Sequence, residues 1–236
     1  MNRLKARLPA RIKSLLRCWQ DRLFDRYSLR CYSQEGEDII LRRIFERETK
    51  GFYIDVGAHH PRRFSNTYLF YQQGWSGINI DAAPGSMRLF SRLRPRDINL
   101  EVAVAESGEA RTFFIFEDPA LNTFDAELAQ TYTRHHYRLL ETRAVRTLPL
   151  KEILTAHIPA YQRINFLSVD VEGFDLQVLR SNDWQLFRPQ YVLAEYAGLS
   201  TMKQAQETDV GLFLNAQGYE LFAKTLNTLV FRDSAF

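Results

Sequence analysis

The sequence has only two cysteines, Cys18 and Cys31, among 236 residues. This number excludes a framework of several disulfides and a zinc site built from cysteines, and it makes a reducing cytoplasm the expected location. Apolar runs of the roughly 18–20 residues that span a bilayer are missing. Lys13 and Arg17 interrupt the apolar positions near the N-terminus, so we expect no signal peptide. The pattern GxGxxG is also absent, which argues against a pyrophosphate-binding dinucleotide site and against an oxidoreductase built on one.

Charge is distributed unevenly along the chain. The totals are 31 Lys and Arg against 28 Asp and Glu, a formal net charge of +3. Residues 1–30 carry nine basic and two acidic side chains, which gives this segment +7 and leaves −4 for the remainder. A nucleic-acid-binding domain would spread basic charge over its folded surface, so we expect no nucleic-acid partner. The basic segment instead predicts an anionic surface as its partner.

The basic segment, residues 1–30, is predicted to be an amphipathic helix that precedes a domain over residues 31–236. Its apolar side chains recur at spacings of three and four, and they are Leu4, Leu8, Ile12, Leu15, Leu16, Trp19, Leu23 and Phe24. One interpretation is a helix that packs on its own domain. The other is a peripheral helix that rests on anionic lipid at the inner membrane face.

From residue 51 onward, short apolar runs alternate with helical patterns. The predicted strands are 51–57, 76–81, 98–105, 110–117, 164–170, 191–195, 219–224 and 228–231. The predicted helices are 64–73, 84–93, a helix from Pro149 to about His157, and 202–217. Residues 118–145 are polar and are predicted to form a lid or insertion. Repeated β-α units imply an α/β fold with a doubly wound, mostly parallel sheet and an antiparallel strand at the end.

Acidic residues end most of the predicted strands. In doubly wound sheets, ligands bind beyond the carboxyl ends of the strands, so these side chains are the first candidates for a site. Several carboxylates that converge on one edge are costly unless they are solvated, paired or functional. The residues are Asp55, Asp81, Asp170, Glu172 and Glu195.

The first two strand ends favour a nucleoside ligand. Asp55 is followed by Gly57 and Ala58, whose small size lets the backbone approach a ligand closely. Asp81 ends the next strand, where a carboxylate can accept hydrogen bonds from ribose hydroxyls. Without GxGxxG, the combination favours a nucleoside without a pyrophosphate, and S-adenosylmethionine is the leading candidate.

The run from Asp170 to Gly173 suggests acid–base or metal chemistry. Asp170 and Glu172 can act as a general base for a substrate hydroxyl, or they can bind a hard cation such as Mg²⁺ together with Glu195. The structural alternative is that Glu172 caps the next helix. His59 and His60 follow Gly57 and are candidates for a base or a substrate contact, or else for solvent-facing loop residues.

Five motifs together resemble the FkbM family of methyltransferases over residues 32–232. They are YSQEGED at 32–38, GFYIDVGAHHP at 51–61, SNTY at 65–68, GWSGINIDA at 74–82 and FLSVDVEGFDLQVL at 166–179. The resemblance implies a class I S-adenosylmethionine-dependent fold with a seven-stranded sheet whose last strand is antiparallel.

The resemblance also implies roles for individual residues. Cofactor contacts are implied for Asp55, Gly57 and Ala58 at the methionine part, Asp81 and Ala82 at the ribose, Ala103 and Val104 at the adenine, and Gln34, Asn66 and Asp170 at the transfer site. The catalytic candidates are Asp170, Glu172, His59 and His60, and the metal candidates are Asp170 and Glu195.

The implied reaction is methylation of a hydroxyl on a sugar or glycan, such as a lipid-linked surface polysaccharide. Two alternatives stay open. One is O-methylation of a small, polyketide-type molecule, and the other is a non-catalytic protein that keeps a cofactor pocket. A homo-oligomer is a further expectation that the sequence alone leaves open.

Overall fold

The computed structural model describes residues 9, 11–15, 19, 27–159, 162–196, 198 and 201–236. The chain divides into two units, Met1–Cys31 and Tyr32–Phe236. In the first unit, residues 11–15 and Trp19 are helical, whereas Pro9 and residues 27–30 are not, and the other positions of the predicted helix lie outside the described residues. Ile12, Leu15 and Trp19 are exposed. Within the described residues, no helix has both the length and the hydropathy needed to cross a bilayer.

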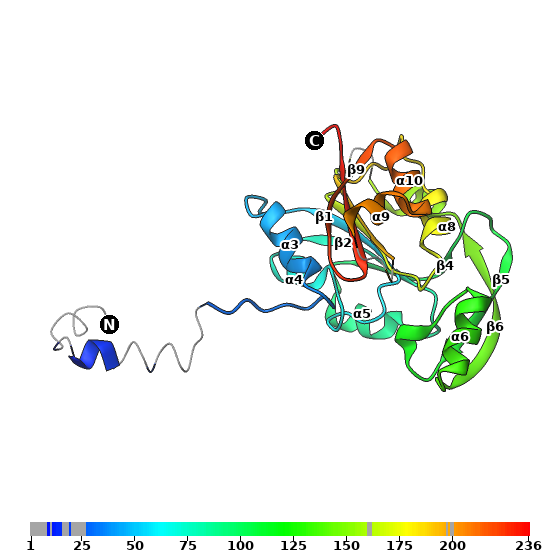
Figure 1. Cartoon of the computed structure of the whole chain (residues 1–236), viewed down its shortest axis with the longest axis horizontal. Coiled ribbons are helices and arrows are strands. Elements are labelled where there is room, and N and C mark those ends of the chain that lie inside the picture. Colours follow the sequence, from blue (N-terminus) through cyan, green and yellow to red (C-terminus); the bar gives the residue numbers. More distant parts are fainter. Residues whose placement is uncertain are drawn as a thin grey trace. The chain divides into compact units, whose positions relative to one another are not determined.

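The second unit is built on a seven-stranded sheet with the order β3-β2-β1-β7-β8-β10-β9 (Figure 1). The strands are β1 (Phe52–Val56), β2 (Ser76–Asp81), β3 (Ile98–Glu101), β7 (Phe166–Val169), β8 (Tyr191–Glu195), β9 (Tyr219–Lys224) and β10 (Thr228–Asp233). Strands β3, β2, β1, β7 and β8 pair in parallel, while β10 is antiparallel to both of its neighbours. The predicted α/β fold with a mostly parallel sheet is therefore confirmed.

Helices cover both faces of this sheet, as alternation along β1 shows. Phe52, Ile54 and Val56 pack in one apolar cluster with residues of α7 (Leu150–His157), α8 (Asp175–Arg180) and α10 (Asp209–Ala216). Tyr53 packs on the opposite face with residues of α3 (Glu37–Ile44) and α4 (Tyr68–Gln72). Burial on both faces explains why β1 reads as an apolar run in the sequence.

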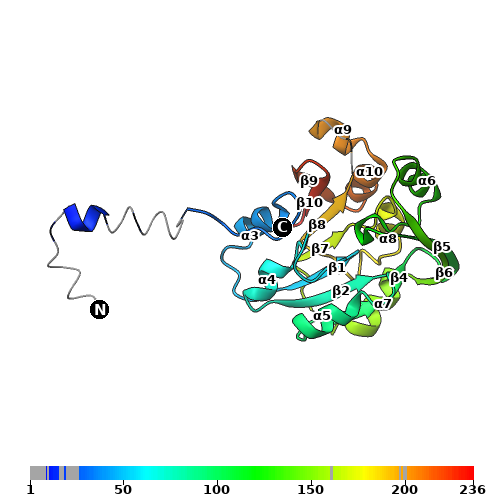
Figure 2. The same ribbon diagram turned by 90° about the horizontal axis from the view of Figure 1, so that it is seen from below.

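A smaller three-stranded sheet, order β4-β6-β5, lies beside the main one. It consists of β4 (Ala103–Val104), β5 (Ala110–Phe116) and β6 (Leu139–Leu148), with the 3-10 helix η1 (Pro119–Leu121) and helix α6 (Ala126–Arg134) between the last two strands. Figures 1 and 2 both show β5, β6 and α6 together at one side of the molecule. The lid predicted over residues 118–145 thus contains η1, α6 and most of β6. Strand β6 escaped prediction because most of its side chains are exposed and show no regular apolar alternation.

Some predicted boundaries were wrong because local hydrogen bonds decide them. The predicted strand 98–105 is divided into β3 and β4, which belong to different sheets. The predicted helix 202–217 is divided into α9 (Met202–Gln206) and α10, since the Thr208 hydroxyl accepts from Gly211 N–H and starts a new helix. Helix α4 begins at Tyr68 rather than at residue 64, and Ser65 Oγ accepts from the backbone N–H groups of Thr67 and Tyr68. Helix α5 (Met87–Leu93) likewise begins three residues after the predicted start at residue 84, behind a turn at Gly85.

Candidate active site

A cavity opens at the carboxyl ends of β1, β2 and β7, which is the edge of the sheet where the sequence predicted a ligand site. Its empty space of about 660 Å³ includes a part that is open to solvent. Seven of the predicted site residues line it, namely Gln34, Gly57, His59, Asp81, Ala82, Asp170 and Glu172. The structure therefore brings residues from four separate parts of the sequence to one place.

The lid and strand β5 directly before it supply a wall of this cavity that the sequence analysis missed. Phe113, Pro119, Ala120, Asn122 and Phe124 line it. The centroids of the Phe113 and Phe124 rings lie 4.5 Å apart with a tilt of 32° between the rings, and together they give the cavity an apolar aromatic wall. The available signal was the aromatic run in 113–116 directly before a polar insertion, which the sequence alone reads equally well as core packing.

The loop after β1 depends on a glycine. Gly57 has a φ of 84°, and a Cβ atom at this position would lie 1.6 Å from the carbonyl oxygen of Asp170. Gly57 N–H and Ala58 N–H both donate to the Ile80 carbonyl, at 2.9 and 3.0 Å. The loop is thus held between β2 and β7, close enough to both that only glycine fits.

Asp81 orders the same loop from the end of β2. Its two carboxylate oxygens accept from His59 N–H at 2.8 Å and from Ala83 N–H at 2.7 Å. Burial raises the pKa of Asp81, and these two hydrogen bonds oppose the rise. Each oxygen keeps a second lone pair, so the carboxylate can accept further hydrogen bonds from a ligand in the cavity.

Five predicted cofactor residues are not among those that line the cavity. Asp55 is buried and points inward, where its Oδ2 atom accepts from the Thr67 hydroxyl at 2.8 Å. Asn66 Nδ2 donates to Ser168 Oγ at 3.0 Å. Ala58, Ala103 and Val104 are buried, and Ala58 packs against α5. The sequence predicted these residues near the strand ends, but it could not show the direction in which their side chains point.

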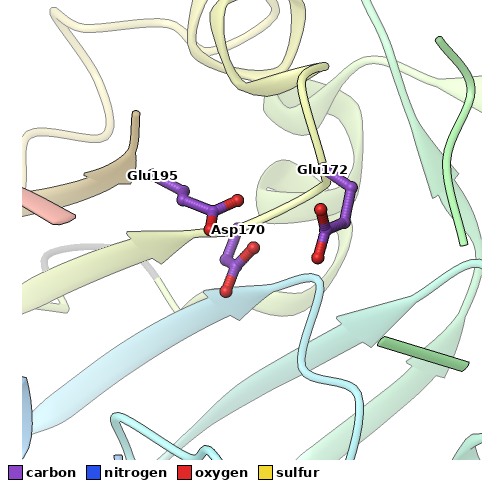
Figure 3. A group of neighbouring side chains, drawn as sticks. All are labelled: Asp170, Glu172 and Glu195. Carbon is purple, nitrogen blue, oxygen red and sulfur yellow. The ribbon is translucent and has the colours of Figure 1, made fainter. Parts of the chain in front are cut away.

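Three carboxylates converge at the ends of β7 and β8. Figure 3 shows the side chains of Asp170, Glu172 and Glu195 pointing toward one another. One oxygen from each lies within 4.8 Å of those of the other two. Asp170 directly follows β7 and Glu195 ends the neighbouring parallel strand β8, while Glu172 reaches the cluster from a backbone with a φ of 52°. Tertiary pairing of β7 and β8 therefore adds Glu195 to the two acids that sequence alone places together.

Burial and the proximity of the three carboxyl groups favour their protonated forms. Burial and the Asp170 charge raise the pKa of Glu172 to about 7, while a hydrogen bond from the Tyr132 hydroxyl opposes the rise. Burial raises the pKa of Asp170, and a hydrogen bond with Glu195 opposes it. Burial and the neighbouring acids raise the pKa of Glu195 as well. A carboxyl group with a pKa near neutrality can accept and release a proton under working conditions.

Further acids surround the cluster. Buried Asp175 accepts from Glu195 N–H at 3.3 Å, and burial raises the Asp175 pKa well above its usual range. Glu35 accepts from Thr225 and Asn227 in the turn between β9 and β10, which holds residues 34–37 beside the cluster. The charges of Glu35 and Glu37 also raise the Asp170 pKa. The site is thus rich in carboxyl groups, and those that are ionised suit a cationic ligand.

The two histidines have different surroundings. His59 lines the cavity, and burial lowers its pKa, which favours the neutral ring. His60 is not among the lining residues, and its Nδ1 atom accepts from the backbone N–H groups of Arg62 and Arg63 at 3.0 and 2.9 Å. His60 thereby orders the turn that follows, which is a structural contribution, whereas His59 is placed to meet a ligand.

Comparisons with known proteins give one family match and several similar folds. The family model described as the methyltransferase FkbM domain matches residues 55–221. Among solved structures, the fold is similar to a TehB-like SAM-dependent methyltransferase from Corynebacterium glutamicum, with 11% identity, a TM-score of 0.41, and coverage of 96% of this chain and 100% of that one. It is also similar to a protein assigned as a type 11 methyltransferase from Sulfolobus solfataricus, with 12% identity, a TM-score of 0.40, and coverage of 85% and 94%. No curated protein matches the chain.

The family model covers well over half of the sequence, and its span includes Asp55, the loop at Gly57, Asp81, the lid and the three carboxylates of Figure 3. The resemblance inferred from the motifs is confirmed. The chain belongs to the FkbM family of S-adenosylmethionine-dependent methyltransferases.

Proposed function

We propose that the protein is an O-methyltransferase that acts on a hydroxyl of a sugar or glycan. The observation that carries this proposal is the group of proton-binding carboxyl groups of Asp170, Glu172 and Glu195, of which Asp170 and Glu172 line the cavity that we assign to the cofactor. A hydroxyl is a weak nucleophile until its proton is withdrawn, so an O-methyltransferase gains from a base at this position.

The cavity fits the cofactor on three counts. Gly57 brings the backbone close to the cavity, Asp81 offers acceptor sites at the end of β2, and the acidic surroundings suit a positive charge. S-adenosylmethionine, when bound, supplies an electrophilic sulfonium methyl group. In the proposal, Asp55 acts on the cofactor's amino group as a negative charge beneath the loop, and Asp81 accepts from the ribose hydroxyls.

Glu172 is the proposed base. Its pKa of about 7 leaves a substantial fraction deprotonated at neutral pH, and its raised value matches that of a group able to take a proton from an acceptor hydroxyl. Tyr132 holds the carboxylate in place from helix α6 at 2.7 Å. Asp170 and Glu195 lie next to Glu172, where their oxygen atoms help to orient the acceptor.

A second, polar cavity next to the first supports a sugar as acceptor. Arg63, Asp118, His136, Tyr137 and Arg138 are among its lining residues, and Pro119 lines both cavities. Charged side chains beside a histidine and an exposed tyrosine ring suit a polyhydroxylated molecule better than a largely apolar polyketide. Lid residues thus form the acceptor side of the site in this proposal.

The direct test is transfer of an isotope-labelled methyl group from the cofactor to a glycan or glycolipid extract, followed by mass spectrometry. We expect labelled methyl ethers on sugars with the native chain, and a rate at least about 100-fold lower with Glu172→Gln. Glu127→Gln, on exposed α6, is the matched control. Label on nitrogen or carbon would contradict O-methylation, and cofactor binding without any transfer would favour the non-catalytic alternative.

A divalent cation is an alternative role for the same carboxylates. Asp170, Glu172 and Glu195 offer the oxygen ligands that Mg²⁺ prefers, and a bound cation would lower the pKa of an acceptor hydroxyl. Dialysis against a chelator, followed by assay with and without Mg²⁺, separates the two roles. Activity that survives chelation favours the base, and activity that returns only with Mg²⁺ favours the metal.

We also propose that residues 1–30 bind an anionic membrane surface and bring the enzyme to lipid-linked acceptors. The segment's charge of +7 and the exposed Ile12, Leu15 and Trp19 support this. Co-sedimentation with anionic vesicles, for the full chain and for residues 31–236, is the test. Equal sedimentation of the two proteins would contradict membrane binding by this segment.

A further inference from the structure

A buried network of hydrogen bonds connects β1 with the ends of α4 and α5, through residues that are not among those lining the cavity. At its centre is Arg94, which directly follows α5 and is fully buried. Its Nε atom donates to Asp97 Oδ2 at 2.8 Å, and its Nη2 atom donates to the Tyr53 hydroxyl at 2.9 Å and to Thr67 Oγ1 at 3.0 Å. A guanidinium is costly to bury, so each of these partners contributes to holding it in place.

Thr67 connects this network to the end of β1. Its hydroxyl accepts from Arg94 and donates to Asp55 Oδ2 at 2.8 Å. A hydroxyl has one proton and Arg94 can only donate, so the direction of the chain is determined: Arg94 donates to Thr67, and Thr67 donates to Asp55. Tyr53 and Asp55 are two residues apart and share one face of β1. Arg94 can therefore bond to Tyr53 directly and connect to Asp55 through Thr67.

A purely structural ion pair would not need this extension. Asp97 already accepts from Arg94, from the Tyr53 hydroxyl, from Gly77 N–H and from Asn79 Nδ2. Arg94 also donates from Nη1 to Ser65 Oγ at 3.4 Å, and through Thr67 it connects to a carboxylate two residues before Gly57. This carboxylate is the one to which the proposed function assigns the cofactor's amino group.

We propose that Thr67 and Arg94 are positioning residues for the cofactor: they hold Asp55 ionised and in one orientation, so that its charge acts on the amino group of S-adenosylmethionine. The inference rests on the role proposed above for Asp55. Neither residue was singled out by the sequence as part of the site.

The charges that face Asp55 explain why it needs such partners. Burial and the neighbouring carboxylates Asp170 and Asp81 favour the protonated form of Asp55, whereas the Arg94 charge and the Thr67 hydrogen bond favour the ionised form. The balance places the pKa of Asp55 at about 6. Loss of the Thr67 donor would therefore raise the pKa of Asp55 into the neutral range.

The test is calorimetric titration of S-adenosylmethionine into the full chain from pH 5 to pH 9. For the native chain, we expect affinity to fall as the pH drops below about 6, as Asp55 gains its proton. Thr67→Val removes the donor and keeps the size of the side chain, and it should move the midpoint of this fall upward by about one pH unit. At pH 9 its affinity should approach that of the native chain, and Thr67→Ser should restore the native profile.

A matched control separates positioning from damage to the fold. Thr208 is also buried and caps α10 with its hydroxyl, and it is not among the residues that line the cavity. Thr208→Val should lower thermal stability without moving the midpoint of cofactor binding. The inference is overturned if Thr67→Val keeps the native midpoint, if it loses affinity equally at every pH, or if Thr208→Val shows the same shift.

Three further outcomes distinguish this inference from the proposed function. Cofactor binding by the native chain that does not vary with pH would overturn the role of Arg94 and Thr67 while leaving methyl transfer to sugars intact. Absence of cofactor binding by the native chain at every pH would overturn both. Failure of methyl transfer to any sugar, with the expected pH profile for binding, would contradict only the acceptor class.

Discussion

The Tyr132 hydroxyl donates a 2.7 Å hydrogen bond to the carboxylate of Glu172 and so connects lid helix α6 to the turn after β7. A second link reaches the same residue, because the Thr123 hydroxyl donates to the Glu172 carbonyl oxygen at 2.7 Å. Glu172 has a left-handed backbone, with a φ of 52°, which is unfavourable for a residue that is not glycine. Two lid contacts therefore help to hold a strained residue in the position of the proposed base.

Tyr132→Phe should move the pH dependence of catalysis. The hydroxyl lowers the Glu172 pKa, so its removal raises that pKa above about 7. A base acts in its deprotonated form, and the acidic limb of the kcat/KM profile should move to higher pH by about one unit. Tyr71→Phe is the control. An unmoved limb in Tyr132→Phe would show that another group controls the reaction.

Removing the buried charge of Glu172 should stabilise the fold at alkaline pH. The folded pKa is about 7 against 4.5 for an unperturbed group, so the folded state binds more protons between these values. Stability from this group is therefore complete below about pH 4.5 and is lost as the pH rises through about 7. Glu172→Gln should gain about 2 kcal/mol at pH 8 and much less at pH 5. Urea unfolding at both pH values measures this, with Glu127→Gln as control, and an equal gain at both would contradict the assignment.

Substitutions at two glycines should differ in their cost to stability, because a Cβ atom has space at one position and none at the other. Gly57 and Gly74 both have positive φ, but a Cβ at Gly57 would overlap the Asp170 carbonyl, whereas none of the described atoms lies within 4 Å of one at Gly74. Gly74→Ala should cost about 1 kcal/mol from backbone strain, and Gly57→Ala about 3 kcal/mol or more, with loss of cofactor binding. Thermal unfolding and calorimetry check this. Similar stabilities of the two variants would show that the loop moves freely.

Asp81→Ala should weaken cofactor binding by about 100-fold, because two charge-assisted hydrogen bonds to a ribose would be lost. The side chain also accepts from His59 and Ala83, so circular dichroism must show that the fold is retained. Asp183→Asn is the control, since that exposed turn can keep its hydrogen bonds with an amide oxygen. Native affinity in Asp81→Ala would exclude ribose recognition by this residue.

Several features of the fold and site could be predicted from local sequence. Short apolar runs ending in acids or glycine identified β1, β2, β7 and β8, because strands buried on both faces leave a continuous apolar signal. The rule that ligands bind at carboxyl strand ends then led to Gly57, Asp81, Asp170 and Glu172. All four line the observed cavity.

Other features were not accessible from local pattern. Strand β6 is exposed on most of its length, so it lacks the alternation that marks a half-buried strand. The contribution of β5 and the lid to the cavity, which includes Phe113 and Phe124, depends on the packing of β5 and β6 beside the sheet. Propensity within the lid says little about that packing.

The sequence by itself determined which residues end the parallel strands, because a strand's period and its limits are local properties. Tertiary structure decided what each of those residues does. Asp55 and Asp81 end neighbouring strands, yet Asp55 turns toward Thr67 and Arg94 while Asp81 lines the cavity. The physical reason is that a carboxylate's direction, burial and proton affinity depend on partners that only folding brings within reach, such as Arg94 for Asp55 and Tyr132 for Glu172.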